Sequence, residues 1–406
     1  MGAMKKIARI LALFSIIATL LAHQCLFAEL SLDQVNQINK IFGINFLQDK
    51  NLWDDTPESF VKRLGAKFEE TEMGGLKVYT TYAKGKILNA SIEQLRFSAS
   101  NGKLSQIEMV FFNKGDSVEG KRWTSQMQRE MKQQWDAIKD SLDKFAGKSQ
   151  KGTWGEGRMK NKAQIWNFGD IVFSLEFKPK EFIILHISQK GQKPSAVSVA
   201  ESNSEEFDGV ANVKKSSNGD VFIDNIPMVD QGPKGYCVPA TLERCFKYYN
   251  IPNVDMHKIA AVCNTQMGGG TTINNVMNDF KKVCNTYKLR MTPVGSLSLY
   301  SIARFVDKGI PICWTMFSTD DYMKRMLENS AMRKSENFQD YCKKIDDQKK
   351  LKKNPEGAHI CLIIGYNKKS NEIAVSNPWG ERFQITWVRF DDAKVVSRNA
   401  FVINPR

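Results

Sequence analysis

Residues 230–249 read Asp-Gln-Gly-Pro-Lys-Gly-Tyr-Cys-Val-Pro-Ala-Thr-Leu-Glu-Arg-Cys-Phe-Lys-Tyr-Tyr, and this stretch decides the fold of the C-terminal half. It begins as a polar turn that is rich in glycine and proline. Apolar residues then recur at roughly helical spacing, which predicts a helix that begins at Cys237. Pro239 fits this prediction because the N–H groups of a first helical turn have no partner inside the helix. The sequence therefore places a thiol at the N-terminus of a helix.

The predicted position of Cys237 suits a nucleophile. The helix dipole and the free N–H groups of the first turn favour the thiolate form of a cysteine. Gln231, six residues earlier, can turn its side-chain amide toward the same place. Together with the backbone N–H of Cys237, that amide would make an oxyanion hole with two donors. The alternative interpretation is a small buried cysteine that follows a glycine turn.

A nucleophilic cysteine also needs a histidine to take its proton and a polar group to orient that histidine. His359 lies in Gly-Ala-His-Ile-Cys-Leu-Ile-Ile-Gly-Tyr, where a glycine-flanked segment leads into an apolar strand. Asn377 lies 18 residues further on, in Ala-Val-Ser-Asn-Pro-Trp-Gly, at the end of a second predicted strand. A hairpin of these two strands would place His359 and Asn377 side by side. The order Cys, His, Asn over this length of chain is typical of papain-like enzymes.

With these residues the C-terminal half resembles the bacterial C39 and C39-like cysteine peptidases of the papain-like superfamily. The resemblance rests on Gln231 and Cys237, then His359, then Asn377-Pro-Trp-Gly, in that order. It implies a catalytic triad of Cys237, His359 and Asn377, in which Cys237 is the thiolate of an ion pair with the His359 imidazolium, with Gln231 in the oxyanion hole. It also implies that Trp379 covers the hydrogen bond between the histidine and the asparagine.

The activity that this resemblance implies is hydrolysis of a peptide bond in a protein or peptide substrate, through a thioester intermediate. The better-known C39 members are fused to export transporters and cut leader peptides after a double glycine. This chain shows neither transporter spans nor an ATP-binding half, so we do not expect the double-glycine specificity. Two other functions stay open: a papain-like amidase that acts on peptidoglycan, and a non-catalytic binding protein built on a C39-like fold.

The first 28 residues predict an export signal. Basic residues precede an apolar run at 10–22, and a small residue, Ala28, stands at the expected cleavage position. The run is too short to span a membrane comfortably, and no later stretch is long and apolar enough. A lipoprotein signal with Cys25 as the acylated residue is the alternative, but the two residues before Cys25 are large and polar. We expect a secreted or periplasmic protein without a transmembrane segment in its mature chain.

Composition predicts a globular protein of more than one domain. The 406 residues are 42% apolar and 25% charged, which is ordinary, and they are too many for a single core. The formal charge of +14 favours weak attraction to an anionic cell-surface polymer. The lysines are scattered and no nucleic-acid motif is present, so a solvated basic surface is the simpler interpretation and we expect no specific nucleic-acid partner.

Residues 29–188 predict an α+β domain with a mainly antiparallel sheet. The sequence does not indicate its role, and an inhibitory pro-region, substrate recognition and partner binding all stay open. One strongly amphipathic helix covers 123–145. His186 falls in an apolar strand and is expected to be structural. The six strand-like runs lie at 77–82, 92–97, 107–112, 163–168, 171–177 and 182–187.

A polar stretch at 189–220 predicts a flexible linker, after which 221–406 form the papain-like domain. In that domain a helix-borne cysteine is expected to pack on an antiparallel sheet that carries the histidine and the asparagine. A helix at 257–263 is expected to hold His257 at the surface. The charged insertion at 319–355 predicts either a rim of the substrate cleft or a solvated helical hairpin.

Seven cysteines remain once Cys25 leaves with the signal, and an odd number leaves at least one thiol free. Cys245 lies in mid-helix and Cys361 in an apolar strand, so we expect both in the core. The sequence has no CxxC pair and no pair of histidines at ligand spacing, and we therefore expect neither a metal nor a cofactor.

Overall fold

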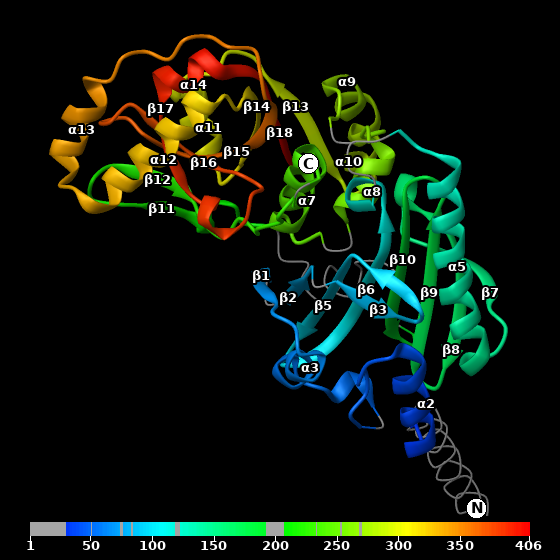
Figure 1. The fold of residues 1–406 in the computed structure, drawn as a ribbon. Coiled ribbons are helices and arrows are strands. Elements are labelled where there is room, and N and C mark those ends of the chain that lie inside the picture. The colour runs from blue at the N-terminus through cyan, green and yellow to red at the C-terminus, as the bar shows by residue number, and fades with distance from the viewer. Residues whose placement is uncertain are drawn as a thin grey trace, which may run out of the picture.

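The computed structural model describes residues 30–406 except 50, 74–75, 83, 118–121, 192–206, 233, 252–253 and 268–269. These residues form two domains, each built around its own antiparallel sheet (Figure 1). The predicted signal peptide and Cys25 lie outside the described residues. Within the described part of the chain, no helix has both the length and the apolar character of a membrane span.

The N-terminal domain contains an eight-stranded sheet in the order β1-β2-β5-β6-β10-β9-β8-β7. Each neighbouring pair is antiparallel, as predicted. The strands are β1 (Glu69–Met73), β2 (Leu76–Thr81), β5 (Gln94–Ser100), β6 (Lys103–Asn113), β7 (Gln150–Trp154), β8 (Asn161–Phe168), β9 (Ile171–Lys178) and β10 (Phe182–Gln189), with a separate hairpin of β3 (Gly85–Ile87) and β4 (Ala90–Ile92).

The amphipathic helix of this domain is α5 (Ser125–Ala146), which packs on one face of the sheet (Figure 1). Thr124 caps it by accepting a hydrogen bond from the backbone N–H of Met127, and Ile138 and Leu142 are fully buried. The helix and the six central strands confirm the predicted α+β fold. Shorter helices that the pattern did not predict are α2 (Leu32–Phe42), α3 (Pro57–Leu64) and α4 (Lys114–Ser117), with the 3-10 turns η1 (Leu52–Asp54) and η2 (Gly157–Met159).

The predicted linker at 189–220 is too long at its C-terminal end. After η3 (Val210–Asn212), strands β11 (Val213–Lys215) and β12 (Asp220–Ile223) join the C-terminal sheet, where β12 pairs with β15. Asp220 is buried and accepts hydrogen bonds at 2.6 Å from both Arg333 and Asn367. The polar residues at this end of the predicted linker therefore belong to an edge strand and to a buried ion pair, and not to a flexible segment.

The C-terminal sheet has the order β11-β12-β15-β14-β18-β13, with β16 on the other edge of β15 and β17 beyond it. Its remaining strands are β13 (Leu289–Val294), β14 (Ile312–Phe317), β15 (Ala358–Asn367), β16 (Glu372–Ser376), β17 (Thr386–Arg389) and β18 (Ser397–Pro405). The helices are α7 (Cys237–Tyr248), α8 (Met256–Val262), α9 (Ile273–Asn275), the π-helical turn η4 (Val276–Phe280), α10 (Lys281–Thr286), α11 (Leu299–Val306), α12 (Asp320–Ser335), α13 (Phe338–Asp346) and α14 (Phe390–Val396), with the 3-10 turn η5 (Glu381–Phe383). A cysteine-bearing helix on a sheet that carries the histidine agrees with the predicted papain-like arrangement.

The two domains meet where α7 and α8 approach strands of the N-terminal sheet (Figure 1). Arg96 on β5 donates to Glu243 on α7 and to Asp255, the N-cap of α8, each at 2.9 Å. Lys258 on α8 forms a 2.9 Å ion pair with Glu176 on β9. The other four residues in these contacts are almost completely buried, whereas Arg96 is slightly more exposed. These four are Glu243, Asp255, Lys258 and Glu176. The interface therefore buries charges that are paired across the domain boundary.

This interface corrects the prediction for His257. The residue is 2% exposed, and its Nδ1 lies 2.8 Å from Asp255 Oδ1. The sequence of α8 gives no sign that a second domain covers it, which is why a surface position was predicted. His186 is buried as well; it bonds Glu176 at 2.9 Å and stacks on Trp154, in the structural role predicted for it.

Candidate active site

Cys237 is the first residue of α7, as predicted. The helix packs on β15, because Thr241 Oγ1 donates to the carbonyl oxygen of Ile360 at 3.3 Å and Cys245 Sγ lies 3.6 Å from Cys313 Sγ on the neighbouring strand. The backbone N–H of Ile360 also faces the sulfur of Cys237. The thiol therefore lies beside the residue that follows His359.

His359 lies at the start of β15 and is 8% exposed. Its Nε2 is 3.1 Å from Asn377 Oδ1. Because a carbonyl oxygen can only accept, Nε2 carries the proton and Nδ1 keeps its lone pair. Asn377 therefore sets the tautomer in which the imidazole has a free basic nitrogen.

Asn377 follows β16 directly, and the antiparallel pairing of β16 with β15 brings it to His359. Its backbone N–H donates to Phe383 O at 3.0 Å, which holds the turn. The ring of Trp379 stacks on the imidazole of His359, with 4.2 Å between centroids and 22° between planes. The predicted hairpin and the predicted place of Trp379 both agree with this geometry.

The insertion at 319–355 packs behind the asparagine. Met326 on α12 places its sulfur 3.9 Å from Asn377 Nδ2. Arg333 on the same helix pairs with Asp220 at 2.6 Å and with Glu372 at 3.1 Å. The hairpin is thus docked on the β16–β17 side of the site and is not merely solvated. The irregular apolar pattern that contains Met326 was the one sequence signal for this contact.

Gln231 lies on the loop between β12 and α7, beside the asparagine turn. Its backbone N–H donates to Pro378 O at 2.9 Å, and its side-chain Nε2 donates to Lys234 O at 3.4 Å. Its Oε1 is buried and has no hydrogen-bond partner among the described residues. Gln231 therefore lies on the loop that precedes Cys237, and its side-chain amide is held by the carbonyl oxygen of Lys234.

The electrostatics of the site favour neutral groups. Burial raises the pKa of Cys237, although the backbone N–H groups of Ile360 and Val238 act against it. Burial lowers the pKa of His359 to about 4, while the hydrogen bond with Asn377 acts in the opposite direction. Among the described residues, no hydrogen bond joins Cys237 to His359. The sequence predicted a thiolate–imidazolium pair; the buried site instead favours a neutral thiol and a neutral imidazole, because burial outweighs the helix N-terminus.

Five of the other six cysteines of the described residues are more buried than Cys237. Cys245 and Cys361 are fully buried, as predicted, and burial raises the pKa of Cys263 to about 12. Cys342, on α13, is the other half-buried thiol, and all seven cysteines of the described residues are free. Those residues contain no cluster of potential metal ligands.

The comparisons with known proteins concern the C-terminal domain. Residues 223–399 match the Peptidase_C39 like family. The C-terminal domain is C39-like. The match contains Cys237, His359 and Asn377, and it leaves the N-terminal domain outside the family.

Among solved structures, the C39-like domain is similar to a protein from Bacillus anthracis that is described as C39-like. The two share 15% sequence identity with a TM-score of 0.30, over 46% of this chain and 98% of that one. No curated protein matches the chain. The assignment of the domain therefore depends on the family match.

Proposed function

We propose that the protein is an exported cysteine peptidase that hydrolyses a peptide bond in a protein or peptide substrate. The observation that carries this proposal is the hydrogen bond between His359 and Asn377 beside the helix that begins at Cys237. The family match at 223–399 supports the same class of activity. Export rests on the signal predicted at 1–28, and the expected location is secreted or periplasmic.

The proposed reaction begins when a substrate enters. His359 Nδ1 takes the proton of Cys237, and the sulfur attacks the carbonyl carbon of the scissile bond. The carbonyl oxygen becomes an oxyanion that accepts hydrogen bonds from the Cys237 N–H and the side-chain amide of Gln231. This role requires the Gln231 amide to exchange its 3.4 Å contact with Lys234 O for the substrate.

The intermediate then collapses. The C–N bond breaks, and His359 gives its proton to the leaving amine, which leaves a thioester on Cys237. His359 next takes a proton from water, and the hydroxide attacks the thioester carbon. The C–S bond then breaks with release of the acid, and His359 returns the proton to the sulfur of Cys237. Asn377 holds the ring in one tautomer throughout, and the stacked Trp379 shields that hydrogen bond from water.

A neutral resting pair fits general-base catalysis. A histidine with a pKa of about 4 is unprotonated at neutral pH and is ready to accept the thiol proton. The proton moves only when the substrate positions the groups, and apo sites often show longer contacts than the reacting complex.

The test is turnover by the full mature chain with a mixture of unstructured peptides, analysed by mass spectrometry. We expect Cys237→Ser to abolish cleavage and Cys342→Ser, at the other half-buried thiol, to leave it unchanged. Equal cleavage by Cys237→Ser would overturn the proposal. Release of fragments from purified cell wall, without cleavage of peptides, would favour the peptidoglycan amidase instead.

A further inference from the structure

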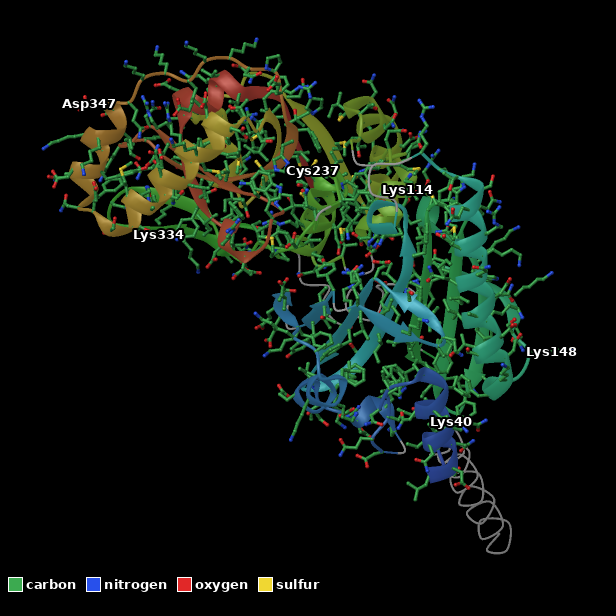
Figure 2. The ribbon with its side chains drawn as sticks, viewed as in Figure 1. Lys40, Lys114, Lys148, Cys237, Lys334 and Asp347 are labelled. Atoms are coloured by element: carbon green, nitrogen blue, oxygen red, sulfur yellow. The ribbon has the colours of Figure 1, made fainter. Side chains whose placement is uncertain are left out.

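The loop at 230–236 is held by the N-terminal domain at both ends. Tyr82, just after β2, donates from its hydroxyl to Asp230 O at 3.1 Å. Asp116 on α4 accepts from Lys234 Nζ at 2.6 Å. Figure 2 shows Cys237 and Lys114, the first residue of α4, near the junction of the two domains.

Lys234 depends on this contact because its side chain is fully buried. Its Nζ lies 5.4 Å from the centre of the Tyr82 ring, on the cation-attracting face. A buried ammonium needs a charged or hydrogen-bonding partner, and Asp116 supplies one. Asn113 in turn holds Asp116 with two hydrogen bonds of 2.8 Å.

The surroundings of the Asp116 carboxylate keep it in its charged form. Burial would raise its pKa, but Lys234 and Asn113 outweigh burial, so that the pKa lies below its usual value. The ion pair is therefore present across the neutral pH range and is not a pH switch. It acts as a fixed attachment between the domains.

At the same place, the backbone of Gly115 lies against two side chains of the loop. A Cβ at this residue would lie 2.8 Å from the Cζ atom of Tyr236 and 3.0 Å from the Cβ of Lys234. Tyr236 is the N-cap residue that precedes Cys237. The N-terminal domain thus touches the residue immediately before the proposed nucleophile.

Within the loop, the residue that is attached to the N-terminal domain contacts Gln231. The Lys234 carbonyl oxygen, on the residue whose side chain is clamped, accepts from Gln231 Nε2 at 3.4 Å. The other side of Gln231 is tied to the asparagine turn through Pro378 O. Asp116 and Tyr82 therefore act on the oxyanion loop through Lys234 and Asp230.

We propose that Tyr82 and Asp116 are positioning residues of the active site, and that the N-terminal domain is a permanent part of the working enzyme. They hold the loop at 230–236 in the shape from which the Gln231 amide can turn to the substrate carbonyl. This inference rests on the proposed function. It also argues against removal of residues 30–191 as an inhibitory pro-region, because their loss would free both ends of the loop.

The experiment uses the full mature chain and two variants, Asp116→Asn and Tyr82→Phe. Tyr82→Phe removes only the hydroxyl and keeps the ring beneath Lys234, so it remains informative if Asp116→Asn folds poorly. Asp54→Asn is the control, because Asp54 forms an exposed ion pair with Lys103 in the same domain. Hydrogen exchange of the backbone amides at 231–236 and steady-state kinetics are measured on each protein.

We expect exchange of the loop amides to rise about tenfold in Asp116→Asn and several-fold in Tyr82→Phe, since each loses a buried hydrogen bond. We expect kcat to fall about tenfold to a hundredfold with KM nearly unchanged, because an oxyanion donor acts on the transition state. The control should match the wild type in both measurements.

Two failures are distinguishable. If the wild type cleaves peptides and both variants keep its kcat, or leave loop exchange unchanged, the positioning role is overturned while the peptidase activity stands. If the wild type cleaves nothing, the proposed function fails, and the catalytic role of Tyr82 and Asp116 fails with it, whatever the exchange shows.

Discussion

His359 donates a hydrogen bond from Nε2 to Asn377 Oδ1 at 3.1 Å, and Trp379 stacks on the same imidazole. The bond leaves Nδ1 as the free basic nitrogen of the ring. Asparagine orients this base without exchanging a proton, so its loss should slow the reaction without abolishing it.

We therefore predict that Asn377→Ala lowers kcat by about tenfold to a hundredfold, less than Cys237→Ala or His359→Ala. Initial rates with a cleaved peptide measure this. Asn399→Ala, at an exposed asparagine on β18, is the control and should keep full activity. A loss in Asn377→Ala as large as that in His359→Ala, in a folded protein, would give the asparagine a different role.

The low pKa of His359 predicts the pH dependence of stability. The ring binds its proton near pH 4 in the folded protein and near pH 6.5 when unfolded, so the unfolded state binds more protons between these values. The stability contributed by the neutral ring is complete above about pH 6.5 and is lost as the pH falls toward 4. The loss should be roughly 3 kcal/mol.

Urea unfolding of the wild type and His359→Ala at several pH values isolates this contribution from that of other titrating groups. The wild type should lose more stability than the variant between pH 7 and pH 4. Parallel curves for the two proteins would show that the folded-state pKa of His359 is ordinary.

The contact of Gly115 with Tyr236 predicts a steric effect at the domain junction. Gly115→Ala should destabilise the protein by about 1–3 kcal/mol, because the added Cβ would lie 2.8 Å from the tyrosine ring. Gly295→Ala is a matched control with nothing within 4 Å of its Cβ. Unfolding midpoints in urea report both, and equal midpoints would place Tyr236 away from Gly115 in solution.

The charges shared by the domains predict that they stay together after cleavage between them. Limited proteolysis should cut first within 192–206, where the sequence is polar. The two fragments should co-elute in gel filtration, since Arg96 is paired with Glu243 and Asp255 across the boundary. Separate elution of two folded fragments would mean that the interface is weak.

The positions of Cys237, His359 and Asn377 in the fold were predictable because each residue lies in a local pattern. A helix start marks Cys237, and two strands in a hairpin mark His359 and Asn377, so short-range rules place all three. The contact of Asp116 with Lys234 was not predictable. The two residues are 118 positions apart, and each is an ordinary polar residue in its own segment.

Burial also explains two of the differences between the sequence predictions and the structure. His257 was expected at the surface because α8 alone has no sign of the sheet that covers it. The expected thiolate–imidazolium pair followed from the helix N-terminus and from the predicted histidine partner. Desolvation of Cys237 and His359 arises from the packing of the whole domain, which the sequence pattern does not contain.

The central claim is that Cys237 is a nucleophile served by His359, and thiol labelling tests it without a known substrate. The intact protein is treated briefly with iodoacetamide at pH 7, and peptide mapping compares Cys237 with Cys342, the other half-buried thiol. Because His359 Nδ1 can accept the thiol proton as the sulfur attacks the reagent, we predict that Cys237 reacts about tenfold faster or more and that His359→Ala removes this advantage. His257→Ala and His186→Ala should preserve it. Equal rates at Cys237 and Cys342, or a Cys237 rate that His359→Ala leaves unchanged, would contradict the account.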